Sequence, residues 1–205
     1  QARPKTPGGG PEWNERQAVI RTGGASRRMA ADKANIEVRG VPMGLRIARE
    51  LSAADWPVLV LGNQPLEEFP FQADAEQHQG PLAALREFAP EGKIVFVVSC
   101  DIPLFRSSVA EALSQSLLEA DAAVPVIGGR PQYLCSAYRS TCFEVRRANP
   151  GLQRMEEWLG LLKARWIDEA RLRELGIDPD WARGANTPEQ LRALLEKADA
   201  TQDLG

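Results

Sequence analysis

TGGASRRMAADKA, residues 22–34, directly follows a short apolar run and combines two adjacent glycines with two arginines and a lysine. Adjacent glycines let backbone N–H groups approach an anion, because no Cβ stands in the way. Arg28 and Lys33 can supply compensating positive charge. Neither the dinucleotide-binding fingerprint nor the Walker spacing is met, since no third glycine follows and no Gly-Lys-Ser/Thr closes the loop. The segment therefore predicts a polyphosphate-binding loop of another kind.

The apolar patterns on either side of this loop alternate between strand and helix, which predicts an α/β fold. We expect a three-layer sandwich, with a mainly parallel, Rossmann-like sheet and an added antiparallel element. Strands are expected at 17–20, 57–61, 69–73, 93–99, 122–127, 133–138 and 164–167. Helices are expected at 42–54, 81–88, 107–119 (capped by serine), 144–148, 152–162, 169–175 and, capped by Thr187, from 188 to about 198.

Asp101 lies directly after the strongly apolar strand expected at 93–99 and is followed by a proline turn at Pro103. Open α/β sheets bind ligands at the carboxyl ends of their strands. Magnesium prefers few carboxylates together with phosphate oxygens and water, so one aspartate suffices when a nucleotide completes the shell. An aspartate at this position fits Mg²⁺ bound with a nucleotide, and a structural turn aspartate is the alternative; the family resemblance described next favours Asp101 as the Mg²⁺ ligand.

Four segments occur in an order that resembles the molybdenum cofactor guanylyltransferase (molybdopterin-guanine dinucleotide synthase) family. They are the opening loop (matching at Gly23, Gly24, Ser26, Arg28, Met29, Asp32, Lys33 and Ala34), GPLAAL at 80–85, VVSCDIPLF at 97–105 and ANTPEQL at 185–191. The resemblance implies a fold like that of nucleotide-diphospho-sugar transferases. It also implies transfer of GMP from GTP to molybdopterin with Mg²⁺ as cofactor and release of pyrophosphate, and it admits protein partners in cofactor delivery.

The same resemblance implies roles for individual residues. Asp74 would accept hydrogen bonds from the guanine N1–H and N2 amine, a pairing that adenine cannot offer; a turn aspartate explains it equally well. Asn63 is a weaker candidate for the base pocket, and Asn186 would help to shape the active centre. The expected catalytic residues are Arg28, Lys33 and Asp101, and the expected nucleotide-binding residues are Thr22, Gly23, Gly24, Ser26, Lys33, Asn63, Asp74, Gly80 and Asn186.

Five positions depart from the family's pattern and keep other functions open. Arg21 and Thr22 stand where the family has Leu-Ala, and Ala30, Ala84 and Gly184 replace residues usual in the family. One alternative is a related nucleotidyltransferase with another base or acceptor, such as CTP or a sugar phosphate. Another is a nucleotide-binding homologue whose catalysis is impaired.

Composition excludes several classes of protein. The 205 residues are 43% hydrophobic and 26% charged with a formal net charge of -3, so no broad cationic surface for nucleic acid is expected. No apolar run approaches the ~20 residues of a membrane span, and three cysteines without a CxxC pair favour a cytoplasmic protein over a disulfide framework. We expect a disordered leader at 1–16, one domain at 17–199 and a flexible tail at 200–205.

Overall fold

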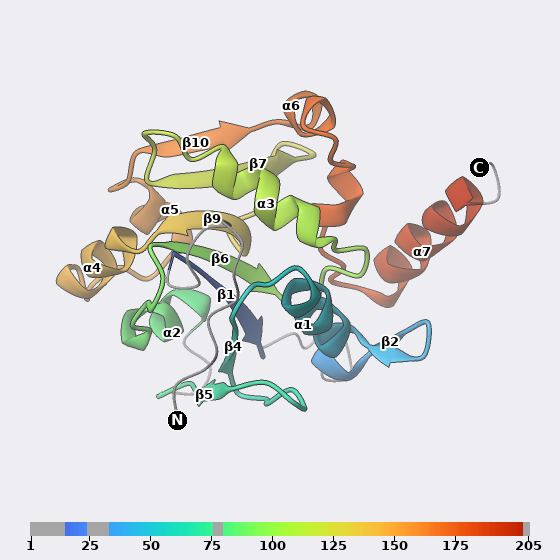
Figure 1. Ribbon diagram of the computed structural model, residues 1–205, viewed down its shortest axis with the longest axis horizontal. Helices are drawn as coiled ribbons and strands as arrows, with labels where there is room; N and C mark the ends of the chain where they lie inside the picture. Colours follow the sequence, from blue (N-terminus) through green and yellow to red (C-terminus); the bar gives the residue numbers. More distant parts are fainter. Residues whose placement is uncertain (1–14, 24–32, 76–79, 203–205) are drawn as a thin grey trace, which may run out of the picture.

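The computed structural model describes residues 15–23, 33–75 and 80–202. A twisted sheet runs through the middle of the molecule in the strand order β10-β7-β9-β6-β1-β4-β5 (Figure 1). Its strands are parallel except for β9, which is antiparallel to both β6 and β7; the short β8 pairs with β7 at the side. The strands are β1 (Arg16–Thr22), β4 (Val58–Gly62), β5 (Phe71–Ala73), β6 (Ile94–Ser99), β7 (Ala122–Ile127), β8 (Arg130–Pro131), β9 (Cys135–Arg139) and β10 (Ala164–Ile167).

Helices cover both faces of this sheet, and each face has its own apolar core. The neighbours Val19 and Ile20 on β1 are fully buried on opposite faces, which is why the central strands read as continuous apolar runs. α1 (Met43–Ala53), α3 (Ser107–Gln115) and α6 (Glu169–Glu174) supply the core of one face. The other core is supplied by α2 (Pro81–Glu87), α4 (Thr141–Ala148) and α5 (Met155–Leu159).

The expected fold class is confirmed, and the strands expected at 122–127 and 164–167 have those bounds. Four helices differ from expectation by three residues or more at one or both ends: α4 begins earlier, at Thr141, α7 (Pro188–Gln202) ends later, and α3 and α5 are shorter. α3 ends at Gln115 and no serine side chain caps it; instead the Glu50 carboxylate accepts a hydrogen bond from the Ser107 N–H at 3.0 Å. α5 begins only at Met155, because the Glu157 carboxylate binds the backbone N–H groups just before it. No helix in the described ranges is long and apolar enough to span a membrane.

Five short elements in the described residues lack a periodic pattern and were not predicted. They are the 3₁₀ turns η1 (Lys33–Asn35) and η2 (Pro179–Ala182), the hairpin strands β2 (Glu37–Val38) and β3 (Val41–Pro42), and the strand β8. Elements of two to four residues give too few positions for a hydrophobic period to emerge.

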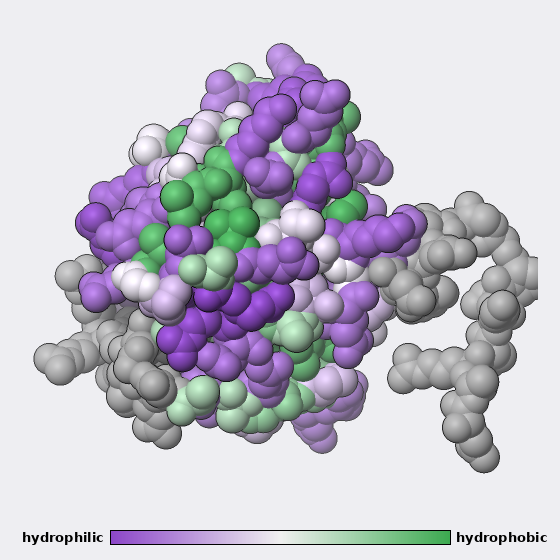
Figure 2. Space-filling view, turned by 90° about the vertical axis from the view of Figure 1, so that its left-hand side faces the viewer, coloured by the Kyte–Doolittle hydropathy of each residue, from purple (hydrophilic) through white to green (hydrophobic). Residues whose placement is uncertain are grey.

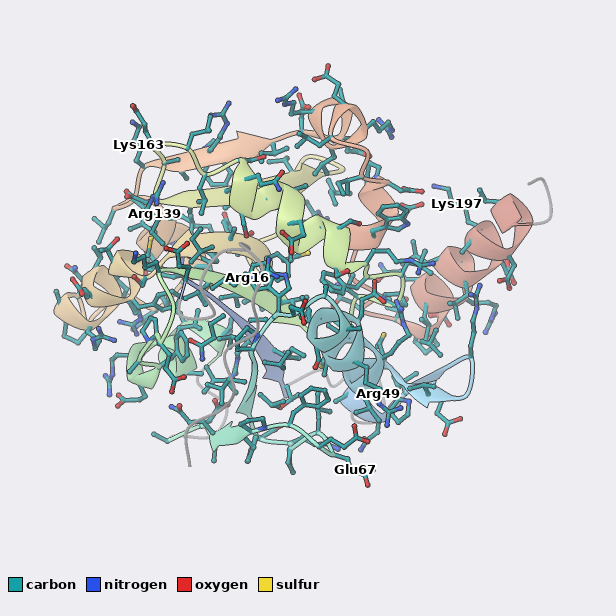
Figure 3. All side chains as sticks on the ribbon, viewed as in Figure 1. Arg16, Arg49, Glu67, Arg139, Lys163 and Lys197 are labelled. Atoms are coloured by element: carbon teal, nitrogen blue, oxygen red, sulfur yellow. The ribbon has the colours of Figure 1, made fainter. Side chains whose placement is uncertain are left out.

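The last helix, α7 (Pro188–Gln202), begins as expected, because the Thr187 hydroxyl accepts a hydrogen bond from the Gln190 N–H at 3.2 Å. α7 is tied to η2 by Lys197, which extends from the helix toward the rest of the molecule (Figure 3). Its ammonium lies 2.5 Å from Asp180, whose other oxygen accepts from Arg183 at 2.9 Å. Burial alone would raise the pKa of Asp180, but the bonds from Lys197 and Arg183 outweigh it and lower the pKa overall.

We predict that this contact is lost in acid. Because the pKa of Asp180 is lower in the folded chain than in the unfolded one, its contribution is fully present above the unfolded value of 3.8 and disappears as the pH falls below it. Asp180→Asn should cost about 1 kcal/mol of unfolding free energy at pH 7, since Lys197 is largely exposed. Urea unfolding of the wild type and of Asp180→Asn at pH 7 and pH 3 measures the cost of the substitution at each pH. An equal cost at the two pH values would contradict the assignment of the lowered pKa to Asp180.

Candidate active site

Four of the expected site residues each follow one of four neighbouring parallel strands. Gly23 follows β1, Asn63 follows β4, Asp74 follows β5, and Asp101 comes two residues after β6. Main-chain hydrogen bonds continue the sheet into these segments. The Asn63 N–H donates to the Thr22 carbonyl at 3.4 Å, and the Asp74 N–H donates to the Gly62 carbonyl at 2.8 Å. The Cys100 N–H donates to the Arg21 main-chain carbonyl at 3.1 Å, which brings the segment after β6 beside the end of β1. The structure thus places these residues in one row along the carboxyl edge.

Gly23 allows the chain to leave β1 under the Asn63 side chain. Its φ is +87°, and a Cβ added there would lie 2.2 Å from the Asn63 amide oxygen, so only glycine fits. Beside it, Thr22 is fully buried and its hydroxyl donates to the Gln64 carbonyl at 2.6 Å. The backbone and the Asn63 amide therefore meet at the start of the glycine loop.

Asp101 is enclosed by the segment that precedes α7. The Ala185 N–H donates to the Asp101 carbonyl at 2.9 Å, and a Cβ added at Gly184 would lie 3.5 Å from the Asp101 carboxylate. Asn186 follows directly, so the fold brings ANTPEQL to the metal candidate although 85 residues separate Asp101 from Asn186 in the sequence. No group of three or more His, Cys, Asp and Glu side chains that could hold a metal occurs in the described part of the chain. Mg²⁺ bound with a nucleotide does not need one.

Arg21 and Asp74 form a buried ion pair at this edge. The Arg21 Nη1 lies 2.8 Å from Asp74 Oδ1 and 2.7 Å from the Leu61 carbonyl, and Nη2 lies 3.3 Å from Asp74 Oδ2. The two side chains are only 6% and 14% exposed, so water screens the pair weakly. Both oxygens of the carboxylate expected to contact guanine thus already accept a hydrogen bond.

Several predicted residues fall wholly or partly outside the described residues. Gly24, Ser26 and Arg28, and the substituted Ala30, belong to the undescribed segment 24–32. Lys33 is described only through its backbone, in η1. Gly80 stands at the start of α2 with a φ of +82°. Ala84, which replaces a glycine of the family, is a buried helical residue without positive φ and therefore causes no backbone strain there.

Two of the three cysteines are held in the thiol form by burial. Cys100, Cys135 and Cys142 are free and buried. Burial, and to a smaller degree the nearby Asp101 carboxylate, raises the pKa of Cys135 far above its ordinary value, and burial raises the pKa of Cys142 to about 12. Both thiols are therefore protonated at neutral pH, when the thiolate would be needed for attack.

A mainly parallel sheet with polar residues along its carboxyl edge and a glycine turn after β1 defines a nucleotidyltransferase-like fold. A solved structure titled as molybdopterin-guanine dinucleotide biosynthesis protein A from Archaeoglobus fulgidus superimposes with a TM-score of 0.71 at 17% identity, covering 90% of this chain and 99% of that one. CMP:2-keto-3-deoxy-manno-octonic acid synthetase, solved with CTP, gives a TM-score of 0.63 at 16% identity, with 91% and 99% covered. At these identities the likeness concerns the fold.

Sequence comparison defines the family. A family model described as the MobA-like NTP transferase domain matches residues 18–169, and the chain belongs to this family of nucleotidyltransferases. It is 28% identical over 200 residues to a probable molybdenum cofactor guanylyltransferase of Nostoc sp., with 91% of this chain and 93% of that protein covered. A protein of the same description from Trichormus variabilis is 29% identical over 206 residues, with the same coverage.

Sequence reasoning did not find the partners of two site residues. Arg21 stood out only as a departure from the family's pattern, and nothing in the sequence indicated that its guanidinium would bind Asp74, 53 residues away. The position of Gly184 against Asp101 was equally hidden, because a glycine signals freedom of the backbone but not what lies beside it.

We predict that Arg21→Met lowers the free energy of unfolding by about 3 kcal/mol, because it leaves the nearly buried Asp74 carboxylate without its cation. Asp74→Asn should also destabilise the protein. Chemical unfolding of the two single variants and the double variant tests the pair: we expect a coupling of about 1–3 kcal/mol. Additive losses would show that the pair contributes nothing of its own.

Proposed function

We propose that this protein transfers GMP from GTP to molybdopterin, forming molybdopterin guanine dinucleotide and releasing pyrophosphate. The observation that supports it best is the row of Gly23, Asn63, Asp74 and Asp101 along one sheet edge, in a chain of the MobA-like family. The relatives described as probable molybdenum cofactor guanylyltransferases align along most of their length with this chain, which favours the same acceptor.

In this proposal GTP lies across the carboxyl edge, from β5 to β6. The glycine turn at Gly23 and Gly24, with Ser26, offers backbone and hydroxyl donors to the phosphates, while Arg28 and Lys33 offset their negative charge. Thr22, Asn63 and Gly80 border the nucleoside. Asp101, with the Asn186 segment beside it, would hold Mg²⁺, for which a carboxylate oxygen at a phosphate-binding edge is a suitable donor.

The transfer is an in-line displacement at the α-phosphorus of GTP. A phosphate oxygen of molybdopterin forms the new P–O bond, and the bond to the β-phosphate oxygen breaks, so that pyrophosphate leaves with the electron pair. Bound Mg²⁺ supplies charge neutralisation at the phosphate oxygens. Arg28 and Lys33 neutralise the leaving group, and the rigid strand ends align the reactants, which is most of what phosphoryl transfer asks of a protein.

Asp74 is the proposed guanine-recognising residue. Each of its oxygens accepts one bond from Arg21, and a carboxylate oxygen has a second lone-pair direction left. The remaining lone pairs of the two Asp74 oxygens can accept hydrogen bonds from the guanine N1–H and N2 amine together. The same ion pair also favours a second candidate, a transferase for another base, since Arg21 neutralises the carboxylate that would select guanine.

We predict that Asp101→Ala lowers kcat for pyrophosphate release from GTP and molybdopterin by at least about 10²-fold, a loss typical of removing a group that stabilises transition-state charge. Asp199→Asn, at an exposed carboxylate on α7, is the matched control and should leave the rate unchanged. Unaltered turnover in Asp101→Ala refutes the metal assignment. Wild-type protein that binds GTP but releases no pyrophosphate under any condition would instead favour the catalytically impaired homologue.

The base preference is tested separately by thermal shift with GTP, ITP, CTP, ATP and UTP in the presence of Mg²⁺. We predict the tightest binding for GTP and about tenfold weaker binding for ITP, which lacks the N2 amine. In the Arg21→Met background, adding Asp74→Asn should reduce the difference between GTP and ITP. A larger shift with CTP than with GTP would contradict guanine selection and favour the second candidate.

A further inference from the structure

A cavity of about 530 Å³ lies between α2 and the segment 150–154, which joins α4 to α5. It borders Asp74 and Ala75 at the end of β5 and is lined by Ala83, Arg86 and Glu87 of α2, by Arg146 of α4 and by Arg154. Figure 2 looks onto the side of the molecule where α4 lies, and hydrophilic residues predominate at the height of α4 and α2. The cavity is thus large enough for a small molecule and rich in guanidinium groups.

Among the described residues, the carboxylates at the cavity already have arginine partners. Each of these acids lies within ion-pair distance of its own arginine, so its negative charge is already largely offset and does not fully neutralise a further arginine. The pairs are Asp74 with Arg21 at 2.8 Å, Glu87 with Arg86 at 2.9 Å, and Glu157, just outside the lining, with Arg154 at 3.4 Å.

Arg146 is the arginine left over. It is 2% exposed, and in the described part of the chain no carboxylate lies within ion-pair distance of it. Its Nε donates to the Leu82 carbonyl and its Nη1 to the Asn149 carbonyl, both at 2.9 Å, while Nη2 has no hydrogen-bond partner among the described residues. Burial, and then repulsion from Arg86, lowers the pKa of Arg146, with Glu87 opposing this.

Arg146 lines the cavity, and because its Nε and Nη1 already donate to carbonyls, its Nη2 is the N–H group left to donate to an anion there. The bond from Arg146 Nε to the Leu82 carbonyl joins α4 to α2, and the bond from Nη1 to the Asn149 carbonyl holds the end of α4. This structural role accounts for Nε and Nη1 but not for Nη2. Arg86 and Arg154 are exposed, and their ion pairs are worth little in water. Both can turn to a ligand at small cost.

We propose that this cavity binds a phosphate-bearing anion, with Arg146 as its buried anchor and Arg86 and Arg154 as exposed partners. A phosphate group offers three acceptor oxygens to guanidinium forks, which suits arginines arriving from three segments. The site is separate from the proposed triphosphate position, because its arginines belong to α2, α4 and the segment before α5 rather than to the segments that follow β1 and β6. It borders Asp74, the proposed guanine-recognising residue.

Calorimetric titration with inorganic phosphate and with glycerol 3-phosphate, at constant ionic strength, tests the site. The titrations use the Lys33→Ala background, so that the proposed triphosphate loop contributes little. We expect saturable binding that weakens at least tenfold in the double variant Arg86→Gln/Arg154→Gln and in Arg146→Gln. Arg171→Gln removes an exposed arginine of α6 and should bind like the background. Tighter binding of glycerol 3-phosphate identifies a phosphorylated metabolite as the ligand class, and tighter binding of phosphate identifies the free ion.

The outcome is independent of the proposed transferase activity. Binding that persists in the exposed double variant, or that is absent from the Lys33→Ala background but present in wild type, overturns the cavity site and locates the anion at the triphosphate loop. Arg146 also joins α2 to α4, so Arg146→Gln can fail to fold; the exposed double variant then decides alone. Failure of guanylyl transfer with retained binding here would refute the proposed function and leave this site standing.

Discussion

The parallel alignment of β4, β1 and β6 is the constraint on which the rest of the structure depends. Ala18 pairs with Val58 on one side and with Phe96 on the other, so the three strands end almost level. Their middle residues are fully buried on both faces, and a shift of register would break the ladder and misplace the buried side chains together. The sheet therefore fixes where each following loop begins, and the polar residues inherit their positions from it.

The apolar interior and the charged edge meet at Arg21. This residue still belongs to β1 and pairs with Leu61 of β4, yet its side chain carries a charge into a nearly buried position. The cost of desolvation is offset because Asp74 and the Leu61 carbonyl accept its N–H groups. At this strand end the ion pair takes the place of apolar packing and gives Asp74 a fixed electrostatic partner. It thereby links the stability of the edge to the proposed choice of base.

The sequence predicted elements that are long and periodic. β6 and α1 were found because apolar runs and helical spacing arise from burial, which the sequence records directly. The row of Gly23, Asn63 and Asp101 could also be anticipated, because each follows a strand and parallel strands end at one edge. The contacts of Arg21 with Asp74, of Ala185 with Asp101 and of Arg146 with Leu82 could not, since they join segments far apart in the sequence and depend on the finished packing.

The central claim is that the residues after β1, β4 and β6 surround one nucleotide. Replacing Mg²⁺ by Mn²⁺ in the presence of GTP and recording paramagnetic broadening of backbone amides by NMR tests it most directly. We predict strong broadening at Gly23, Asn63, Asp101 and Asn186, and little at the end of α7. Broadening centred elsewhere, or an unchanged spectrum in the presence of saturating Mn²⁺ and GTP, would contradict the account.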